Sequence, residues 1–289
     1  MQLALSFERD GVRALLTSDA TQNGTRARRQ FAPGATPARM WLDAIELGNE
    51  LCARSAIETS QLERCVVTFP AAVSSEGVIL DEGRFRVWRG YDLTRGLREH
   101  LRIQNVEALS NVCARARYEA HFGELQSLNS WLFVHVGGRI ESWARVQGVE
   151  LAGVQVGTQI IERDGALDEW GRRGSLNAYC SSEALEGRAQ SYGLGGQGIA
   201  RLFETAPSNF AAQSLCDDFC ARLSQGLGNA AALLGGVPLC IGGSISREVW
   251  PLVYPRLEPF LKAMWPPAIP LSLFPACGDD DSALWGALS

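Results

Sequence analysis

Three consecutive acids, Asp279-Asp280-Asp281, stand near the end of the chain and could bind a metal ion. Carboxylate oxygens are ligands that Mg²⁺ accepts, usually together with substrate phosphates. The same acids precede the residues of a predicted C-terminal helix, where negative charge and a capping side chain are favourable. We expect the second role, in which the acids cap and solvate the start of the last helix.

Other reactive groups are few. Lys262 is the only lysine, so mechanisms that need a lysine nucleophile or base have a single weak candidate. Cys216 and Cys220 lie four residues apart on a predicted helix, but none of the three histidines completes a metal-binding signature with them. Cys113 falls on a predicted buried helix face with no histidine near it in sequence. The eight cysteines are therefore predicted to be buried free thiols, and we expect no bound metal.

Composition describes an ordinary globular protein. The chain has 289 residues, of which 46% are hydrophobic and 20% charged, with a net charge of −5, so it can form one large domain or two lobes. Its densest basic cluster, Arg26, Arg28 and Arg29, is predicted to lie in a solvated loop, so no nucleic-acid partner is expected. The N-terminus does not resemble a signal peptide and no apolar run is long enough to cross a membrane. We expect a cytoplasmic protein without a membrane partner.

The pattern of apolar residues predicts an α/β protein, because strands and helices interleave along the chain. The expected strands are Leu3–Phe7, Val12–Thr17, Cys65–Phe69, Trp131–Val136 and Pro238–Ile241. The expected long helices cover Pro37–Ala56 and Ala211–Leu234, and a glycine turn, Gly242-Gly243-Ser244, follows the last strand.

The stretch Gly171–Tyr179 resembles the segment CxCGxxGCLEAYAS of the ROK family of bacterial sugar kinases and repressors. Three cysteines and one histidine of that family hold a structural Zn²⁺. The residues at the matching positions here are Asp168, Trp170, Ser175 and Thr158. Tryptophan cannot ligate a metal, and one carboxylate with two hydroxyls is a poor zinc site. We therefore expect no zinc, with packing, for instance of Trp170, in place of the metal.

The same resemblance marks the positions that bind a sugar in the family. Its glutamate and histidine of the GEIGH segment and the glutamate of CLE match Gln155, Thr158 and Asn177, which are uncharged. The asparagine that precedes its Leu-Pro-Gly-Trp segment is matched by Arg84. We take Arg84, Gln155, Thr158 and Asn177 as candidate substrate-binding residues.

Further matches follow in the family's order over nearly the full length, at Leu80–Leu97, Glu119–Gly123, Ser214–Ser246 and Gly278–Ala283. The resemblance implies the actin-like, ribonuclease H-like ATPase fold, with a nucleotide cleft between two α/β lobes. The expected lobes are residues 1–115 with 277–289, and residues 116–276. The winged-helix segment of ROK repressors is not matched, so direct DNA binding is not expected.

The resemblance also shows departures at the catalytic positions. Asn111 matches the aspartate that takes a proton from the sugar hydroxyl, and an amide cannot do this near neutral pH, which predicts a loss of about 10²–10⁴ in rate. In the first phosphate loop, DxGGTxxR in the family, Glu8 and Asp10 bring carboxylates close to where phosphates would sit. The second loop, GTGIGGG in the family, is matched by Gly137–Trp143, where Arg139, Glu141 and Trp143 replace glycines.

Of the expected nucleotide-binding segments, only the turn near the adenine and ribose, Ile241–Ser246, matches the family's sequence well. Gly137, Gly138, Gly242, Gly243 and Ser244 are the candidate nucleotide-binding residues, although the last three also suit a plain strand-to-helix turn. We favour the plain turn.

Three functions remain open. The favoured one is a catalytically degenerate sugar kinase-like protein, a pseudokinase with a binding, scaffold or regulatory role and no required cofactor. The alternatives are an active ATP-dependent sugar kinase, of glucose or N-acetylhexosamine type, with a rebuilt site that uses Mg-ATP, and a non-catalytic protein that binds a small carbohydrate. The resemblance makes a homodimer an expectation, and a scaffold role would need a protein partner. A site filled by Arg139 and Trp143 would favour the scaffold.

Overall fold

The computed structural model describes residues 1–18, 23–80, 83–196 and 198–289, which form two compact units. The first unit comprises Met1–His121 with Gly278–Ser289, and the second comprises Phe122–Cys277. Each unit contains one five-stranded mixed sheet with helices, so the expected α/β class is confirmed.

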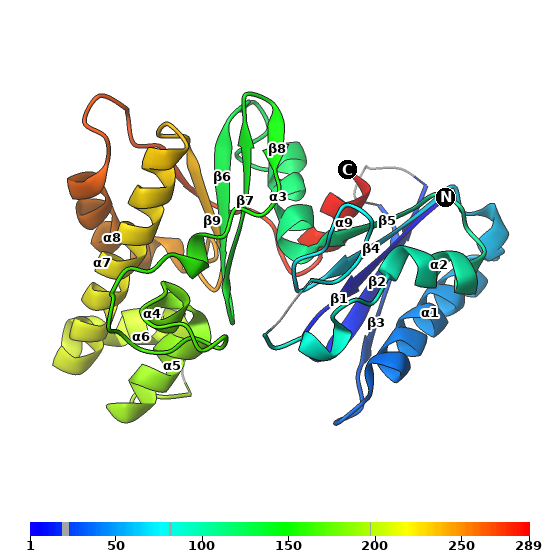
Figure 1. Ribbon diagram of the computed structural model, residues 1–289, viewed down its shortest axis with the longest axis horizontal. Coiled ribbons are helices and arrows are strands. Elements are labelled where there is room, and N and C mark those ends of the chain that lie inside the picture. The colour runs from blue at the N-terminus through cyan, green and yellow to red at the C-terminus, as the bar shows by residue number, and fades with distance from the viewer. Residues whose placement is uncertain (19–22, 81–82, 197) are drawn as a thin grey trace. The chain divides into compact units, whose positions relative to one another are not determined.

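The sheet of the first unit has the order β3-β2-β1-β4-β5 (Figure 1). Its strands are β1 Gln2–Phe7, β2 Gly11–Thr17, β3 Thr25–Gln30, β4 Arg64–Phe69 and β5 Val106–Ser110. The first three strands are antiparallel, and β4 and β5 continue the sheet in parallel with β1. The predicted strands that correspond to β1, β2 and β4 are confirmed. Their apolar runs suit strands of a sheet that is covered on both faces.

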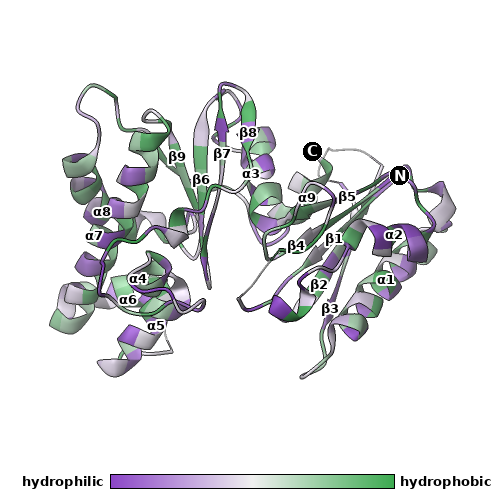
Figure 2. Ribbon diagram, viewed as in Figure 1, coloured by the Kyte–Doolittle hydropathy of each residue, from purple (hydrophilic) through white to green (hydrophobic). Residues whose placement is uncertain are grey.

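Helices cover both faces of this sheet. They are α1 Pro37–Arg54, α2 Leu93–Leu101, α3 Asn111–Phe122 and α9 Ser282–Leu288, with short 3₁₀ turns at Thr59–Gln61 and Arg86–Trp88. In Figure 1, α1 and α2 lie on one face and α9 on the other, where α9 packs against β1, β2 and β4. The predicted helix at 37–56 is confirmed, with Thr36 as its N-cap and its end at Arg54. In Figure 2, β4 is mostly hydrophobic, whereas α1 carries residues of both kinds, as expected for a buried strand and a surface helix.

The arginine cluster corrects one expectation. Arg26, Arg28 and Arg29 lie on β3, the edge strand, and not in a loop. Each guanidinium pairs with an acid elsewhere in the unit: Arg26 with Asp281 at 3.1 Å, Arg28 with Asp10 at 3.5 Å, and Arg29 with Glu46 at 2.7 Å. Charged side chains on an edge strand also discourage pairing with another sheet. Local sequence missed the strand because its stability comes from pairing with β2 and from these long-range ion pairs.

The sheet of the second unit has the order β10-β9-β6-β7-β8. Its strands are β6 Trp131–Val136, β7 Ile140–Val146, β8 Val149–Leu151, β9 Leu239–Gly243 and β10 Leu273–Pro275. Strands β6, β9 and β10 are parallel neighbours, whereas β7 and β8 are antiparallel to theirs. The predicted strand at 131–136 is confirmed, and the one at 238–241 continues two residues further, through Gly242 and Gly243.

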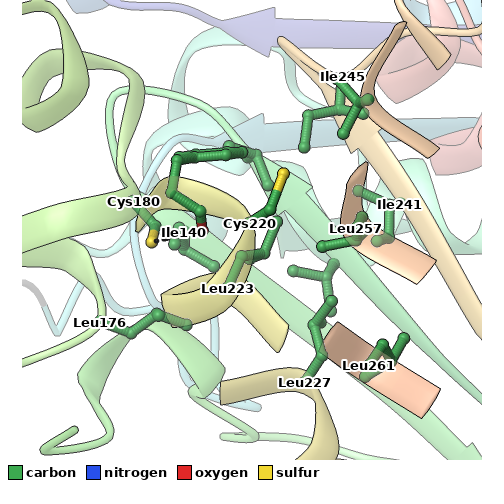
Figure 3. Packing of buried hydrophobic residues seen from close by; sticks show 14 of the residues in the cluster. Ile140, Leu176, Cys180, Cys220, Leu223, Leu227, Ile241, Ile245, Leu257 and Leu261 are labelled. Carbon is green, nitrogen blue, oxygen red and sulfur yellow. Dashed lines mark hydrogen bonds between the residues drawn. The ribbon is translucent and has the colours of Figure 1, made fainter. Parts of the chain in front are cut away.

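Helices of the second unit enclose one apolar core with this sheet. They are α4 Asn177–Cys180, α5 Ser182–Ser191, α6 Gly198–Thr205, α7 Phe210–Leu233 and α8 Trp250–Met264, with 3₁₀ turns at Val156–Thr158 and Ala206–Ser208. Figure 3 shows Leu223 and Leu227 of α7 against Leu257 and Leu261 of α8, near Ile241 of β9. The predicted long helix at 211–234 is thus confirmed as α7.

The cysteines behave as core residues. All eight are thiols outside any disulfide, and all but Cys277 are buried. Burial raises the pKa of the Cys216 thiol to about 12, so this thiol stays protonated and unreactive at neutral pH. Within the described ranges, no helix is long and apolar enough to cross a membrane.

Candidate functional site

Asn111 joins the ends of two strands. It is the first residue of α3, directly after β5, and is only 7% exposed. Its side-chain Nδ2 donates to the carbonyl oxygen of Phe7, the last residue of β1, at 2.8 Å. Its Oδ1 is also buried and accepts no hydrogen bond from the described residues. Because an amide does not take up a proton at neutral pH, Asn111 can fix α3 to β1 but has no capacity as a general base.

The turn between β1 and β2 is filled with paired charges. The backbone N–H of Glu8 donates to the Gly11 carbonyl at 2.8 Å and closes the turn. The Glu8 carboxylate lies 3.4 Å from Nε of Arg13 and 3.9 Å from a guanidinium nitrogen of Arg115. Burial lowers the pKa of Arg13, but Glu8 and Asp280 raise it more, so Arg13 remains charged. This turn presents side-chain ions where a phosphate loop would present bare backbone N–H groups.

The three acids at 279–281 do not cap α9 with their side chains, which corrects the sequence-based expectation. Asp281 occupies the N-cap position, yet its side chain makes no capping hydrogen bond. Instead, Asp280 and Asp281 bind Arg13 at 2.8 and 3.1 Å, and Asp281 also binds Arg26. The Asp279 carboxylate accepts from the Asp281 backbone N–H at 2.9 Å. These long-range ion pairs are available because α9 packs on the same sheet that carries Arg13 and Arg26.

Two glycine turns lie side by side in the second unit. Strands β6 and β9 are parallel with Val136 opposite Gly243, so both turns leave the same edge of the sheet. Gly243 has φ +81°, and a Cβ there would lie 2.4 Å from the Val136 carbonyl oxygen. The Ser244 N–H donates to that same carbonyl at 2.7 Å. Close backbone packing therefore requires glycine at position 243.

Arg139 belongs to the other glycine turn. The turn is closed by Gly137 N–H donating to the Arg139 carbonyl at 2.9 Å. The Arg139 side chain is only 9% exposed, and its guanidinium lies 3.4 Å from Glu141 and 3.5 Å from Glu169. The same guanidinium sits over the ring of Trp170, 5.4 Å from its centroid, within cation–π range. A buried, paired cation thus occupies a segment that in a phosphate-binding turn would be glycine.

The positions that match zinc ligands form a different arrangement. The Asp168 carboxylate accepts hydrogen bonds from the backbone N–H groups of Trp170 and Arg172 at 2.9 and 3.0 Å, and from the Ser175 hydroxyl at 2.7 Å. Burial raises the pKa of Asp168, but these hydrogen bonds outweigh burial and hold it below its usual value. The Thr158 hydroxyl donates to the Gln155 carbonyl at 3.0 Å. The donor set does not fit zinc, because its carboxylate and hydroxyls are engaged with one another or with backbone.

The four candidate substrate residues are placed unequally. Gln155 is exposed and Thr158 half-buried, at the two ends of one 3₁₀ turn. Asn177 is buried, its Oδ1 accepting from the Ile140 N–H at 2.6 Å, while its Nδ2 has no hydrogen-bond partner within the described residues. Arg84 belongs to the first unit, in the loop before the 3₁₀ turn Arg86–Trp88, and is half-buried. The structure therefore brings Gln155 and Thr158 together on one turn.

One pocket of about 280 Å³ adjoins both the Arg139 turn and the Asp168 loop. It is lined by Gly138, Arg139, Leu167, Asp168, Glu169, Asn177, Ala178, Ser181, Glu183 and Ala184. Among the described residues, no group of three or more His, Cys, Asp or Glu side chains is arranged to hold a metal ion.

Sequence reasoning missed the partners of the substituted residues. Arg139 and Trp170 are 31 positions apart, and Arg13 and Asp280 are 267 positions apart, yet each pair is in contact. The sequence did contain one indication of the Arg139–Trp170 contact. An arginine stands at a glycine position of one family motif, and a tryptophan stands at a metal-ligand position of another. Only the fold brings these two substituted positions into contact.

The two sheets, with their helices and glycine turns, define an actin-like, sugar-kinase-like α/β protein. Solved structures agree across 99% of this chain. The ROK hexokinase from Thermus thermophilus has a TM-score of 0.78 at 18% identity with 96% of its chain covered, and the ROK glucokinase from Streptomyces griseus, in complex with glucose and AMPPNP, has 0.77 at 16% with 97% covered. A ROK family transcriptional regulator, a homolog of the E. coli MLC protein, has 0.85 at 16%, with 76% of its chain covered.

The profile of the ROK family matches residues 10–289, and the chain belongs to this family. The resemblance seen in the separate motifs is thereby confirmed. No curated protein sequence matches the chain significantly. Because the solved relatives share less than a fifth of their residues with it, their similarity establishes the fold and not the activity.

Proposed function

We propose that this protein is a catalytically degenerate ROK family member, a pseudokinase that acts by binding and not by phosphoryl transfer. The observation that carries the proposal is Arg139, a residue of the second glycine turn whose buried guanidinium pairs with Glu141 and Glu169. Phosphate binding at such a turn depends on close approach of backbone N–H groups. A side chain anchored by two carboxylates and an aromatic ring opposes that approach.

Two features of the first unit support the same proposal. Asn111 stands at the position of the family's base and uses its amide to bind the Phe7 carbonyl. The first turn carries the Glu8 carboxylate, which pairs with Arg13 and Arg115 and would repel a phosphate. The charged side chains of these two turns do not fit the phosphates of Mg-ATP. We further propose a cytoplasmic protein that works through a protein partner and forms a homodimer.

The alternative, an active sugar kinase with a rebuilt site, needs a free carboxylate as metal ligand or base. Two candidate carboxylates already form ion pairs: Glu8 with Arg13 and Arg115, and Glu141 with Arg139. Asp10 lies 3.5 Å from Arg28. The kinase alternative would therefore require these ion pairs to break.

Calorimetric titration with Mg-ATP tests the proposal. We expect no heat of binding up to millimolar nucleotide, either alone or with glucose, N-acetylglucosamine or N-acetylmannosamine present, because both turns carry paired ionic side chains, Glu8 and Arg139. A Kd of about 1 µM would correspond to roughly −8 kcal/mol of binding free energy and would contradict the pseudokinase. A phosphoryl-transfer assay on the same samples would then identify the accepted sugar.

A second candidate function is non-catalytic binding of a small carbohydrate, and the pocket at Arg139 and Asn177 favours it. Its volume of about 280 Å³ is close to the lower limit of about 300 Å³ that is usual for small-molecule sites. Its lining mixes small residues, such as Gly138 and Ala178, with polar ones, such as Ser181 and Glu183. Such a lining suits a neutral, polyhydroxylated molecule.

We expect this pocket to be blocked by Ala184→Phe, which adds an aromatic ring to its wall and removes no hydrogen-bonding side chain. The measurement is titration of wild type and variant with each of the three sugars in the absence of nucleotide. Heat with wild type that disappears in the variant supports carbohydrate binding at the pocket. Silence of the wild-type protein excludes this candidate, and equal heat from both proteins places the sugar elsewhere.

A further inference from the structure

The loop from Gln159 to Ser175 is the part of this protein where the family's zinc and this chain's residues disagree most clearly. Its two ends meet: Leu176 N–H donates to the Gln159 carbonyl at 2.8 Å, and Ile161 N–H donates to the Gly174 carbonyl at 2.8 Å. Between these bonds the chain makes an exposed excursion with no helix and only single β-bridges. Ordering a loop of this length costs conformational entropy, so the loop needs stabilising contacts within itself.

Asp168 is placed to organise that loop. Its side chain has no solvent exposure. One carboxylate oxygen accepts from the N–H groups of Trp170 and Arg172, and the other accepts from the Ser175 hydroxyl and from Nε of Arg172 at 3.2 Å. A single carboxylate therefore joins the middle of the loop to its end, as a metal ion with several protein ligands would.

Trp170 extends this arrangement to the neighbouring glycine turn. The guanidinium groups of Arg172 and Arg139 lie 4.7 and 5.4 Å from the centroid of its ring. Arg172 also pairs with Asp168 at 3.1 Å, whereas Arg139 belongs to the turn after β6. Trp170, at the position of a zinc-binding cysteine of the family, thus contacts both Asp168 and Arg139 of the neighbouring turn.

The rest of the loop is anchored by contacts that also involve no metal. The hydroxyl of Tyr179 accepts from the Ala166 N–H at 2.7 Å. Arg222 of α7 stacks on the Tyr179 ring, 3.9 Å from its centroid, and binds Glu162 at 2.7 Å. Gly174 has φ +71°, and a Cβ there would lie 1.4 Å from the Glu162 carbonyl oxygen, so only glycine fits. The loop is thus held at both ends and at its centre.

We infer that the Asp168 carboxylate replaces the structural zinc of the family: it is the metal-free hub that fixes the 159–175 loop and, through Trp170, connects that loop to the Arg139 turn. The inference is independent of whether the protein transfers phosphate. Asp168 is thus a positioning residue, which holds the loop through its hydrogen bonds to Trp170, Arg172 and Ser175.

Hydrogen exchange measured residue by residue tests the hub. In Asp168→Ala, we expect the amide exchange rates of Trp170 and Arg172 to rise about tenfold or more, because each loses a hydrogen bond to a charged acceptor. In Asp168→Asn, the amide oxygen still accepts from these two N–H groups, so their protection should be largely retained. Asp164→Ala is the matched control, because Asp164 lies exposed in the same loop and takes part in none of these contacts.

Metal content provides the second arm. We expect the wild-type protein, expressed with zinc in the medium, to contain well under one zinc per chain, and its Tm to be unchanged by a strong chelator, because zinc-dependent folds are lost when the metal is removed. The inference is overturned by stoichiometric zinc with a chelator-sensitive Tm. It is also overturned if Asp168→Ala exchanges no faster at Trp170 and Arg172 than Asp164→Ala. Partial rescue by Asp168→Asn separates the hub from general destabilisation, which would raise exchange throughout the unit in both variants.

Discussion

Gly286→Ala is expected to lower the free energy of unfolding by about 3 kcal/mol or more, and the Tm by roughly 6–12 °C. Gly286 is a buried residue of α9, and a Cβ there would lie 1.8 Å from the Ala114 carbonyl oxygen and 2.7 Å from the Tyr118 N–H nitrogen. Both atoms belong to the backbone of α3, so no side-chain rotation relieves the clash. The two helices would have to separate, and they carry Asp281 and Asn111 at their starts.

The control for this prediction is Gly187→Ala. Gly187 is an exposed interior residue of α5, and nothing lies within 4 Å of a Cβ built there. Alanine has the higher helix propensity, so this variant should be unchanged or more stable by up to about 1 kcal/mol. Thermal and urea unfolding of both variants check the pair. Equal stabilities would show that α9 does not approach α3 as closely as the structure has it.

Asn111→Asp is expected to destabilise the protein by about 3–5 kcal/mol at neutral pH and to leave phosphoryl transfer at background. The change restores the family's acid, but at a site that is 7% exposed and where Nδ2 now donates to the Phe7 carbonyl at 2.8 Å. The introduced carboxylate would face that carbonyl oxygen as a second acceptor, without a donor between them. A sugar-phosphorylation assay and urea unfolding are the measurements.

The pH dependence of this effect has a definite sign. Burial beside a carbonyl raises the folded-state pKa of the introduced carboxyl above its unfolded value of about 3.9. The loss of stability is therefore absent below the unfolded pKa and grows as pH rises above it. Asn209→Asp is the matched control, because Asn209 caps α7 by accepting from Ala212 N–H, a role that aspartate fills equally well. ATP-dependent phosphorylation of a sugar by Asn111→Asp would contradict the pseudokinase proposal.

Much of the fold could be predicted from local pattern. The strands at 2–7, 11–17, 64–69 and 131–136 and the helices at 37–54 and 210–233 follow from apolar periodicity, which acts between residues close in sequence. Strand β3 could not be found this way, because its arginines read as a polar loop. Its partners, such as Glu46 and Asp281, lie on α1 and at the start of α9.

The family, the fold and the identity of each replaced residue could be recognised in the sequence: an amide at 111, an arginine at 139 and a tryptophan at 170. The contacts that those residues make are visible only in the folded protein. It showed that Arg139 and Trp170 meet, that Asp168 gathers the donors of its own loop, and that Asp280 and Asp281 bind Arg13 and Arg26 and do not cap α9. The physical reason is range: propensity and periodicity act within a few residues, whereas ion pairs, stacking and buried hydrogen bonds depend on which distant segments the fold brings into contact.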